Sequence, residues 1–336
     1  MVLNQRQIAL GAEYLRQGRL VAFPTETVYG LGANAWDAAA VRQIFAAKGR
    51  PADNPLIVHI ADYATLDQVV DHIPPAACAL MQAFWPGPLS LVLPKKKQVP
   101  AIVTAGLDTV AVRWPNHPVA EALIRQAQVP VAAPSANRSG RPSPTLAQHV
   151  AADLGEAVDL IIDAGMVAIG LESTVVDMTG SEPILLRPGA VTIEDLTKIV
   201  GPVSRAGYAP EQPVRSPGMK YAHYAPQAPL YLYLGEPSTV VQAQLGKAAE
   251  LASQNQRVGI LTYDQFAAKF SAYTPLSLGQ YDEPAQAAQK LYQQLRRFDE
   301  LNVDVILAHG YPSEAGLGLA LQNRLIKAAG FRLVWV

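Results

Sequence analysis

The stretch TVAVRWP, residues 109–115, decides the fold class. It is a short apolar run that reaches Arg113 and is then stopped by an aromatic residue and a proline. Because side chains alternate across a strand, Thr109, Ala111 and Arg113 share one face, and the two valines lie on the other. The stretch therefore predicts a buried strand that carries a cation at its carboxyl end.

Similar apolar runs recur on both sides of this stretch. They are LIVHI (56–60), LSLVLP (89–94), VPVAAPSAN (129–137), LIIDAG (160–165), STVVDM (173–178) and ILLRP (184–188). Helical spacing of apolar residues appears at 5–17, 117–127 and 145–154, and at 37–50 with Asp37 as N-cap. Strands and helices alternate irregularly, which predicts an α/β fold with a mixed sheet rather than a regular βαβ repeat.

The C-terminal third follows a different plan. Residues 201–229 are rich in proline and glycine, which exclude helices and central strands. Beyond them strands and helices alternate regularly, as in a small doubly wound, Rossmann-like domain. We therefore expect a domain at 1–200, a linker at 201–229 and a smaller domain at 230–336. The linker is either a passive tether or a lid over the active site.

The composition narrows the function classes. The 336 residues include 27 Lys+Arg and 28 Asp+Glu, which gives a net charge of -1. This charge argues against a protein that binds phosphate-rich partners through a general excess of basic residues. The single cysteine, Cys78, excludes a disulfide framework and a CxxC zinc site. The histidines show no metal-ligand spacing, so no protein-held metal is expected. No apolar run reaches 18 residues and no leader pattern opens the chain, so we expect a cytoplasmic protein without a membrane partner.

Cationic residues next to prolines indicate the kind of ligand that the protein binds. Arg113 and Arg187 follow apolar strands, and Lys48 and Arg50 flank Gly49 just before Pro51. Open α/β sheets bind ligands at the carboxyl ends of their strands, and guanidinium groups match phosphate and carboxylate oxygens. Each arginine alone is more simply a surface ion pair. Together they predict an anion site.

Seven segments together resemble the YrdC-domain threonylcarbamoyl-adenylate synthases. They are PTETVYGLG (24–32), KGRPADNPLIVHI (48–60), FWPGPLSLVL (84–93), VAVRWPNHP (110–118), APSANRSG (133–140), ESTVVD (172–177) and ILLRPGAV (184–191). SPGMKYAHYAP (216–226) resembles the linker of the family's two-domain form. The resemblance implies a twisted mixed sheet around a concave cavity.

The resemblance also implies the reaction. L-Threonine, bicarbonate or carbon dioxide, and ATP would give threonylcarbamoyl-AMP and pyrophosphate, through adenylyl transfer to N-carboxy-threonine by a nucleotidyltransferase. A separate transferase complex would then modify tRNA. Mg²⁺ would be held mainly by the ATP phosphates.

The family's motif positions assign roles residue by residue. The residues implied to hold threonine are Thr27, His59, Arg113, Ala133 and Ser173. Those implied to hold ATP are Arg50, Asn54, Thr109, Ser135, Ser143, Arg187 and Tyr224. Lys48 and Arg50 would act on the phosphates as catalytic residues, and Tyr224 would close over the nucleotide with the linker.

Two other interpretations remain at this point. An RNA- or tRNA-binding module with a concave basic surface would explain Lys95–Lys97, Arg138 and Arg141, although the net charge and the lack of interleaved aromatic residues argue against it. Weak tRNA binding is compatible with the enzyme as well. A carbamoyl-transfer enzyme of the hydrogenase-maturation type would need zinc-finger segments, which one cysteine does not supply.

Overall fold

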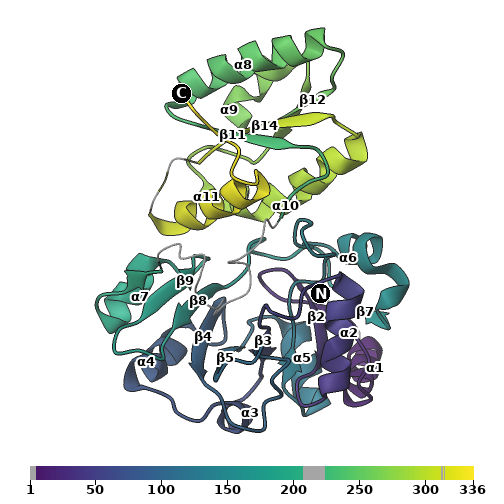
Figure 1. The fold of residues 1–336 in the computed structure, drawn as a ribbon, viewed down its shortest axis with the longest axis vertical. Coiled ribbons are helices and arrows are strands. Elements are labelled where there is room, and N and C mark those ends of the chain that lie inside the picture. Colours follow the sequence, from purple (N-terminus) through teal and green to yellow (C-terminus); the bar gives the residue numbers. More distant parts are fainter. Residues whose placement is uncertain (1–4, 207–223, 312, 314) are drawn as a thin grey trace. The chain divides into compact units, whose positions relative to one another are not determined.

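The computed structural model describes residues 5–206, 224–311, 313 and 315–336, and these form two compact units (Figure 1). The first unit holds the described chain up to Ser139, Ser143–Ala168, and the residues from Glu172 to 206. The second holds the chain from Tyr224 on, together with the short segments Gly140–Pro142 and Ile169–Leu171.

The first unit is built on a mixed sheet of ten strands in the order β10-β9-β8-β4-β5-β3-β6-β2-β1-β7. Parallel and antiparallel pairs both occur, which confirms the predicted mixed α/β sheet. The strands are β1 (Val21–Pro24), β2 (Tyr29–Asn34), β3 (Ile57–His59), β4 (Leu89–Pro94), β5 (Thr109–Arg113), β6 (Val131–Ala132), β7 (Leu160–Ile161), β8 (Thr174–Asp177), β9 (Ile184–Arg187) and β10 (Ser204–Arg205).

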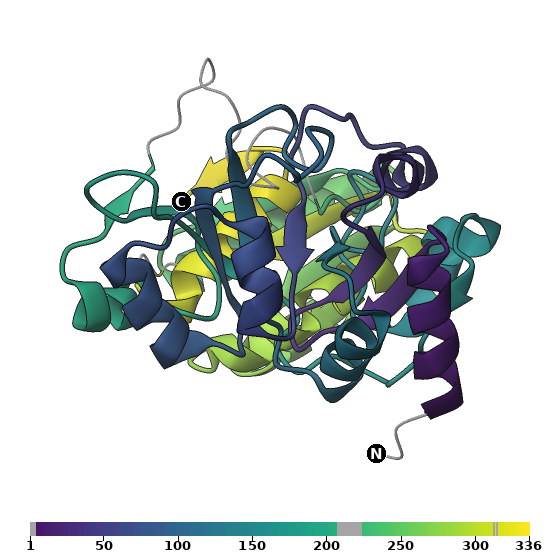
Figure 2. The same cartoon turned by 90° about the horizontal axis from the view of Figure 1, so that it is seen from below.

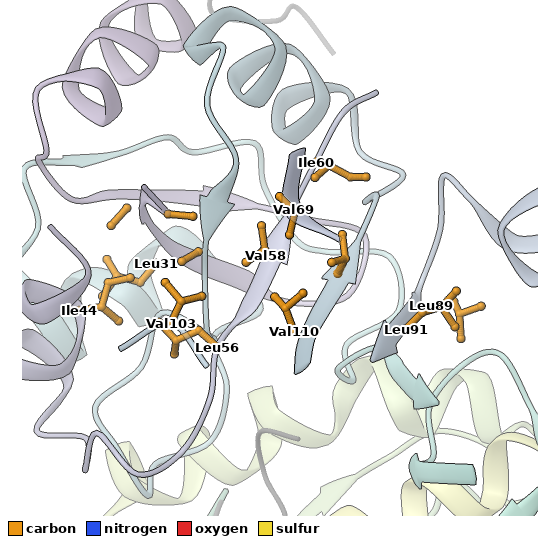
Figure 3. Close-up of a cluster of buried hydrophobic side chains, with 14 of the residues drawn as sticks. Leu31, Ile44, Leu56, Val58, Ile60, Val69, Leu89, Leu91, Val103 and Val110 are labelled. Atoms are coloured by element: carbon orange, nitrogen blue, oxygen red, sulfur yellow. The ribbon is translucent and has the colours of Figure 1, made fainter. Parts of the chain in front are cut away.

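The two faces of this sheet differ, as the alternation in β5 predicts. Val110 and Val112 belong to the main hydrophobic core. Val110 lies there with Val58 of β3 and Leu91 of β4 (Figure 3). Ala111 lies on the other face in a small separate cluster with Ile57, Val92 and Val175. We call this second side the site face, since Arg113 and His59 share it by alternation.

Helices cover parts of both faces of the sheet. They are α1 (Gln5–Arg16), α2 (Ala38–Lys48), α3 (Tyr63–Val69), α4 (Pro75–Phe84), α5 (Pro118–Ala127), α6 (Ala147–Leu154), η1 (Gly155–Ala157) and α7 (Ile193–Val200). Helix α1, purple in Figure 2, packs against α5. Helix α2 begins at the predicted cap, where the Asp37 carboxylate accepts from two backbone N–H groups, and it ends at Gly49 with φ 59°.

The second unit is a parallel sheet in the order β13-β12-β14-β11-β15. Helices α8 and α9 lie on one side of it and α10 and α11 on the other (Figure 1), which confirms the doubly wound, Rossmann-like prediction. The elements are β11 (Leu230–Leu234), α8 (Pro237–Ser253), β12 (Val258–Thr262), α9 (Asp264–Ala267), η2 (Ala268–Phe270), β13 (Thr274–Ser277), α10 (Pro284–Leu301), β14 (Val305–His309), α11 (Gly316–Ala328) and β15 (Leu333–Trp335).

Some features go beyond the sequence prediction. The predicted linker opens with β10, which pairs in parallel with β9 as an edge strand. Helices α7 and α9 were not predicted. The lid expected at 216–226 lies almost wholly outside the described residues. Within the described part of the chain, no helix is long and apolar enough to cross a membrane.

Candidate active site

Arg113 lies at the carboxyl end of β5 and is buried on the site face. Its Nε donates to Gly87 O at 3.2 Å, and its Nη1 donates to Thr27 Oγ1 at 2.9 Å. Its Nη2 lies 2.7 Å from Glu26 Oε1, in an ion pair whose side chains are 4% and 9% exposed. Thr27 and Arg113, two of the residues assigned to threonine, are therefore in direct contact.

The pair between Glu26 and Arg113 has an unusual geometry. Its separation is that of a close ion pair, yet neither Arg113 Nη2 nor either Glu26 carboxylate oxygen makes a hydrogen bond with a described residue. The contact between the two side chains is therefore electrostatic, and both retain hydrogen-bonding capacity. One cation with an available donor thus lies beside one anion with available acceptors.

His59 lies beside this pair, because β3 and β5 are parallel and place His59 opposite Arg113. The ring Nδ1 is 3.2 Å from Ile57 O. Burial, and to a lesser extent the Arg113 charge, lower the pKa of His59 to about 3. The imidazole is therefore neutral at physiological pH and presents hydrogen-bonding groups rather than a charge.

Arg187 and Ser173 extend the same region across the sheet. Arg187 Nε donates to Ser173 O at 3.0 Å and Nη2 donates to Ser173 Oγ at 3.1 Å. The Ser173 hydroxyl is also 2.8 Å from that of Ser90, which pairs with Arg113 in the β4–β5 ladder. Strands β5 and β9 run in the same direction, since β4 is antiparallel to β5, β8 parallel to β4 and β9 antiparallel to β8. Both arginines consequently lie at strand ends on one edge, as predicted.

Lys48 and the 133–137 loop form a second group. Lys48 ends α2, is 2% exposed, and donates through Nζ to Ser135 O and, at 2.5 Å, to Asn137 O. Ser135 Oγ donates to Asn137 Oδ1 at 2.5 Å. Ala133 N–H donates to Ile57 O at 2.9 Å, so a ligand would have to use the Ala133 carbonyl. Lys48 thus holds the shape of the loop that carries Ser135.

The remaining residues assigned to ATP are distributed more widely. Arg50 Nη2 donates to Asn54 O and Pro55 O, each at 3.3 Å, so Arg50 and Asn54 are neighbours. Ser143 Oγ donates to Glu172 Oε1 at 2.5 Å. Thr109 begins β5, which puts it about 13 Å from Arg113 along the strand.

Tyr224 belongs to the second unit, where it is 5% exposed. Its ring stacks on Tyr292 with centroids 5.2 Å apart, and the Arg324 guanidinium lies 5.6 Å from its centroid. Its assignment to the nucleotide remains a prediction.

Glu26 and Glu172 are the acidic residues that the sequence analysis did not assign. Both lie in quoted motifs, PTET and ESTVVD, but only the fold brings them to Arg113 and Ser143. Within the described ranges, no three His, Cys, Asp or Glu side chains are grouped so as to hold a metal ion.

Comparisons with known proteins cover both units. Residues 13–189 match the model of the Sua5, YciO and YrdC family, described as "Telomere recombination", and residues 191–330 match the one described as "Threonylcarbamoyl-AMP synthase, C-terminal domain". The chain is 48% identical to the threonylcarbamoyl-AMP synthase of Bacillus subtilis, over 98% of this chain and 95% of that protein. It is 47% identical to the one from Pyrococcus abyssi, over 99% and 97%. The crystal structure of P. abyssi Sua5 complexed with L-threonine superposes with a TM-score of 0.95 at 46% identity, covering 100% of this chain and 98% of that one.

Proposed function

The chain belongs to the threonylcarbamoyl-AMP synthase family, and from this premise we propose which of its groups bind each substrate and what each contributes to the reaction. The observation that carries the proposal is the buried pair of Glu26 and Arg113, with hydrogen-bonding capacity left on both partners. A free amino acid is a zwitterion, and such a pair offers a donor to its carboxylate and an acceptor to its ammonium group.

Threonine is the amino acid that this region suits. The neutral His59 and the hydroxyls of Thr27 and Ser173 supply partners for a side-chain hydroxyl beside the charged pair. The P. abyssi relative has been crystallised with L-threonine. A methyl group distinguishes threonine from serine by only about 1–3 kcal/mol, so we expect slow turnover of serine.

The cations on either side would hold the triphosphate of ATP. Arg187 contacts Ser173, Arg50 contacts the Asn54 segment, and Lys48 anchors the Ser135 loop. The hydroxyls of Thr109, Ser135 and Ser143 would contribute neutral contacts to the same ligand. ATP would enter as its Mg²⁺ complex, with the ion carried mainly by the phosphates.

The chemistry needs no protein nucleophile. The threonine ammonium group first loses a proton to solvent, and the resulting amine forms a C–N bond with carbon dioxide and loses a second proton, which gives a carbamate. A carbamate oxygen then attacks the α-phosphorus of ATP, the bond from that phosphorus to the β-phosphate oxygen breaks, and pyrophosphate leaves. This adenylyl transfer makes the enzyme a nucleotidyltransferase, and catalysis rests on positioning and on electrostatic stabilisation by the arginines and Lys48.

The product is a mixed anhydride that water can hydrolyse, so a further enzyme must transfer its threonylcarbamoyl group to an acceptor. We propose that a tRNA threonylcarbamoyl-transferase complex consumes it, that both act in the cytoplasm, and that any direct contact of this chain with tRNA is weak. Lys95 and Lys96 donate to backbone carbonyls of Val99 and Asp67, so part of the basic run that favoured an RNA-binding module is engaged in local structure.

Pyrophosphate release tests this function directly. The full chain with ATP, threonine and bicarbonate should release pyrophosphate, and omission of any one substrate should reduce the rate to background. Serine in place of threonine should give a rate at least about tenfold lower. Equal rates with serine, or release independent of bicarbonate, would overturn the proposed binding of an N-carboxylated threonine.

An RNA-binding module would behave differently in the same preparation. It would bind tRNA with a steep dependence on salt and would not consume ATP.

A further inference from the structure

The sheet of the second unit has a topological switch point, where the connections that leave two neighbouring strands pass to opposite sides of the sheet. Neighbouring parallel strands β12 and β14 end at Thr262 and His309. From β12 the chain passes into α9 on one side of the sheet, and from β14 into α11 on the other (Figure 1). Doubly wound folds bind their ligands in the crevice that opens at the carboxyl ends of such strands.

Polar atoms without partners gather at this point. Within the part of the chain that the structure describes, no hydrogen bond reaches Thr262 Oγ1, the hydroxyls of Tyr263 and Tyr281, or either ring nitrogen of His309. Thr262, Tyr263 and His309 are 0%, 0% and 1% exposed. A buried polar group without a hydrogen bond destabilises the folded state by about 1–3 kcal/mol, so five such atoms in one place are unfavourable in a region with a purely structural role.

Aromatic rings surround these atoms. Phe266 of α9 stacks on His309, with centroids 5.2 Å apart and ring planes at 13°. The ring centroid of Tyr281 lies 5.7 Å from the centroids of both His309 and Tyr311, and 4.9 Å from that of Tyr263. We call these residues the edge cluster: Thr262, Tyr263, Phe266, Tyr281, His309 and Tyr311. Its combination of flat apolar surfaces and hydrogen-bonding groups suits a planar, polar ligand.

The charges around the edge cluster exclude phosphate groups. Burial lowers the pKa of His309 to about 4, against an opposing effect of Glu236, so the imidazole is neutral. Burial, with smaller effects of Tyr311 and Glu236, raises the pKa of Tyr281 to about 12, and burial, with a smaller effect of Asp282, raises the pKa of Tyr311. The charged neighbours that influence these groups are thus acidic, and an anion would be repelled.

We propose that the edge cluster binds an uncharged nitrogen heterocycle with both donors and acceptors on its rim, of the nucleobase or nucleoside class. A neutral imidazole donates from one nitrogen and accepts at the other, and the three hydroxyls can do either. Such a ligand would satisfy the five unpartnered atoms through its rim and stack its faces on the aromatic rings. All six residues of the edge cluster belong to the second unit, and none of them is assigned to the substrate site.

Calorimetric titration of the full chain with adenosine and with uridine, in the presence of enough ATP to fill the substrate site of the first unit, tests the proposal. At least one probe should bind with Kd below about 1 mM. Tyr281→Phe and His309→Asn should each weaken that binding by about tenfold or more, while leaving pyrophosphate release unchanged. Tyr231→Phe, an exposed tyrosine on β11, is the matched control and should bind like the wild type.

Four results would overturn the proposal. They are no binding of either probe at several times that concentration, binding that survives both edge-cluster substitutions, binding of AMP as tight as that of adenosine through the same residues, and preferential binding of tetramethylammonium. The last would identify an aromatic cage for cations instead. If His309→Asn does not fold, Tyr281→Phe, which removes only a hydroxyl, decides the question.

Discussion

Glu26 and Arg113 illustrate how much a single buried charge can depend on its partner. Replacing Glu26 by glutamine keeps the shape but leaves the guanidinium buried without a counter-charge. We expect Glu26→Gln to lower the free energy of unfolding by about 3–5 kcal/mol, measured by urea denaturation of the full chain.

The control for this prediction is Glu13→Gln, which breaks a pair with Arg16 whose side chains are 48% and 42% exposed. That exposed pair should contribute little to the free energy of unfolding, because water and salt screen it. Equal effects of the two substitutions would show that burial does not decide the strength of the Glu26 contact.

His59 makes the stability of the protein depend on pH. Because its pKa is about 3 in the folded chain and 6.5 in the reference state, the unfolded chain binds a proton below pH 6.5 that the folded chain does not. The protonation of His59 therefore leaves the free energy of unfolding unchanged above pH 6.5. Between pH 6.5 and pH 3 it lowers that free energy by about 1.4 kcal/mol for each pH unit as the solution is acidified. Unfolding free energies measured between pH 7 and pH 4 should decline less steeply for His59→Gln, and parallel profiles would contradict the prediction.

Single residues were predictable where a local pattern fixed them. Arg113 and Arg187 were found because an apolar strand, a cation and a proline follow each other in the sequence, and both lie at strand ends. Glu26 was missed because it lies in a turn of threonines, and nothing local indicates that the turn meets a strand far along the chain.

At the scale of elements, Gly189 couples β9 to the segment that carries Ser173. A Cβ atom at this position would lie 2.4 Å from Thr174 N and 2.8 Å from Glu172 O. We expect Gly189→Ala to lower stability by about 1–3 kcal/mol and to reduce pyrophosphate release, because the backbone beside Ser173 must move. Denaturation and the release assay on the same preparation measure both effects.

Gly246→Ala is the matched control, since Gly246 lies in α8 with open space around its Cβ position. There the substitution should stabilise the protein by about 0.5–1 kcal/mol. Normal release by Gly189→Ala would mean that the 172–174 segment does not position the substrates.

Elements with a strong internal pattern were predicted, and those defined by distant partners were not. β4 and β5 follow from their short apolar runs, and the two ends of α2 follow from Asp37 and Gly49. Helix α7 was missed, although Thr192 and Asp195 form a capping box, which is a sequence signature of a helix N-terminus. β10 has two exposed residues and exists only through its pairing with β9, which no local signal reveals.

At the scale of the whole molecule, each unit carries a hydrophobic core of its own. All groups proposed to hold threonine lie in the first unit. We expect threonine to slow amide exchange near Thr27, His59 and Arg113 and to leave the strands of 230–336 unchanged, as measured by mass spectrometry on the full chain. Comparable slowing in β12 and β14 would contradict the assignment.

The alternation within β3, β4 and β5 has a consequence for redesign. Positions 57, 59, 111 and 113 project from the site face, while the residues between them build the core. A combinatorial library that keeps Arg113 with its buried partner Glu26 and varies positions 57, 59 and 111 would change the site face without touching the residues of the main core, so new amino-acid preferences can be searched for while that core stays intact.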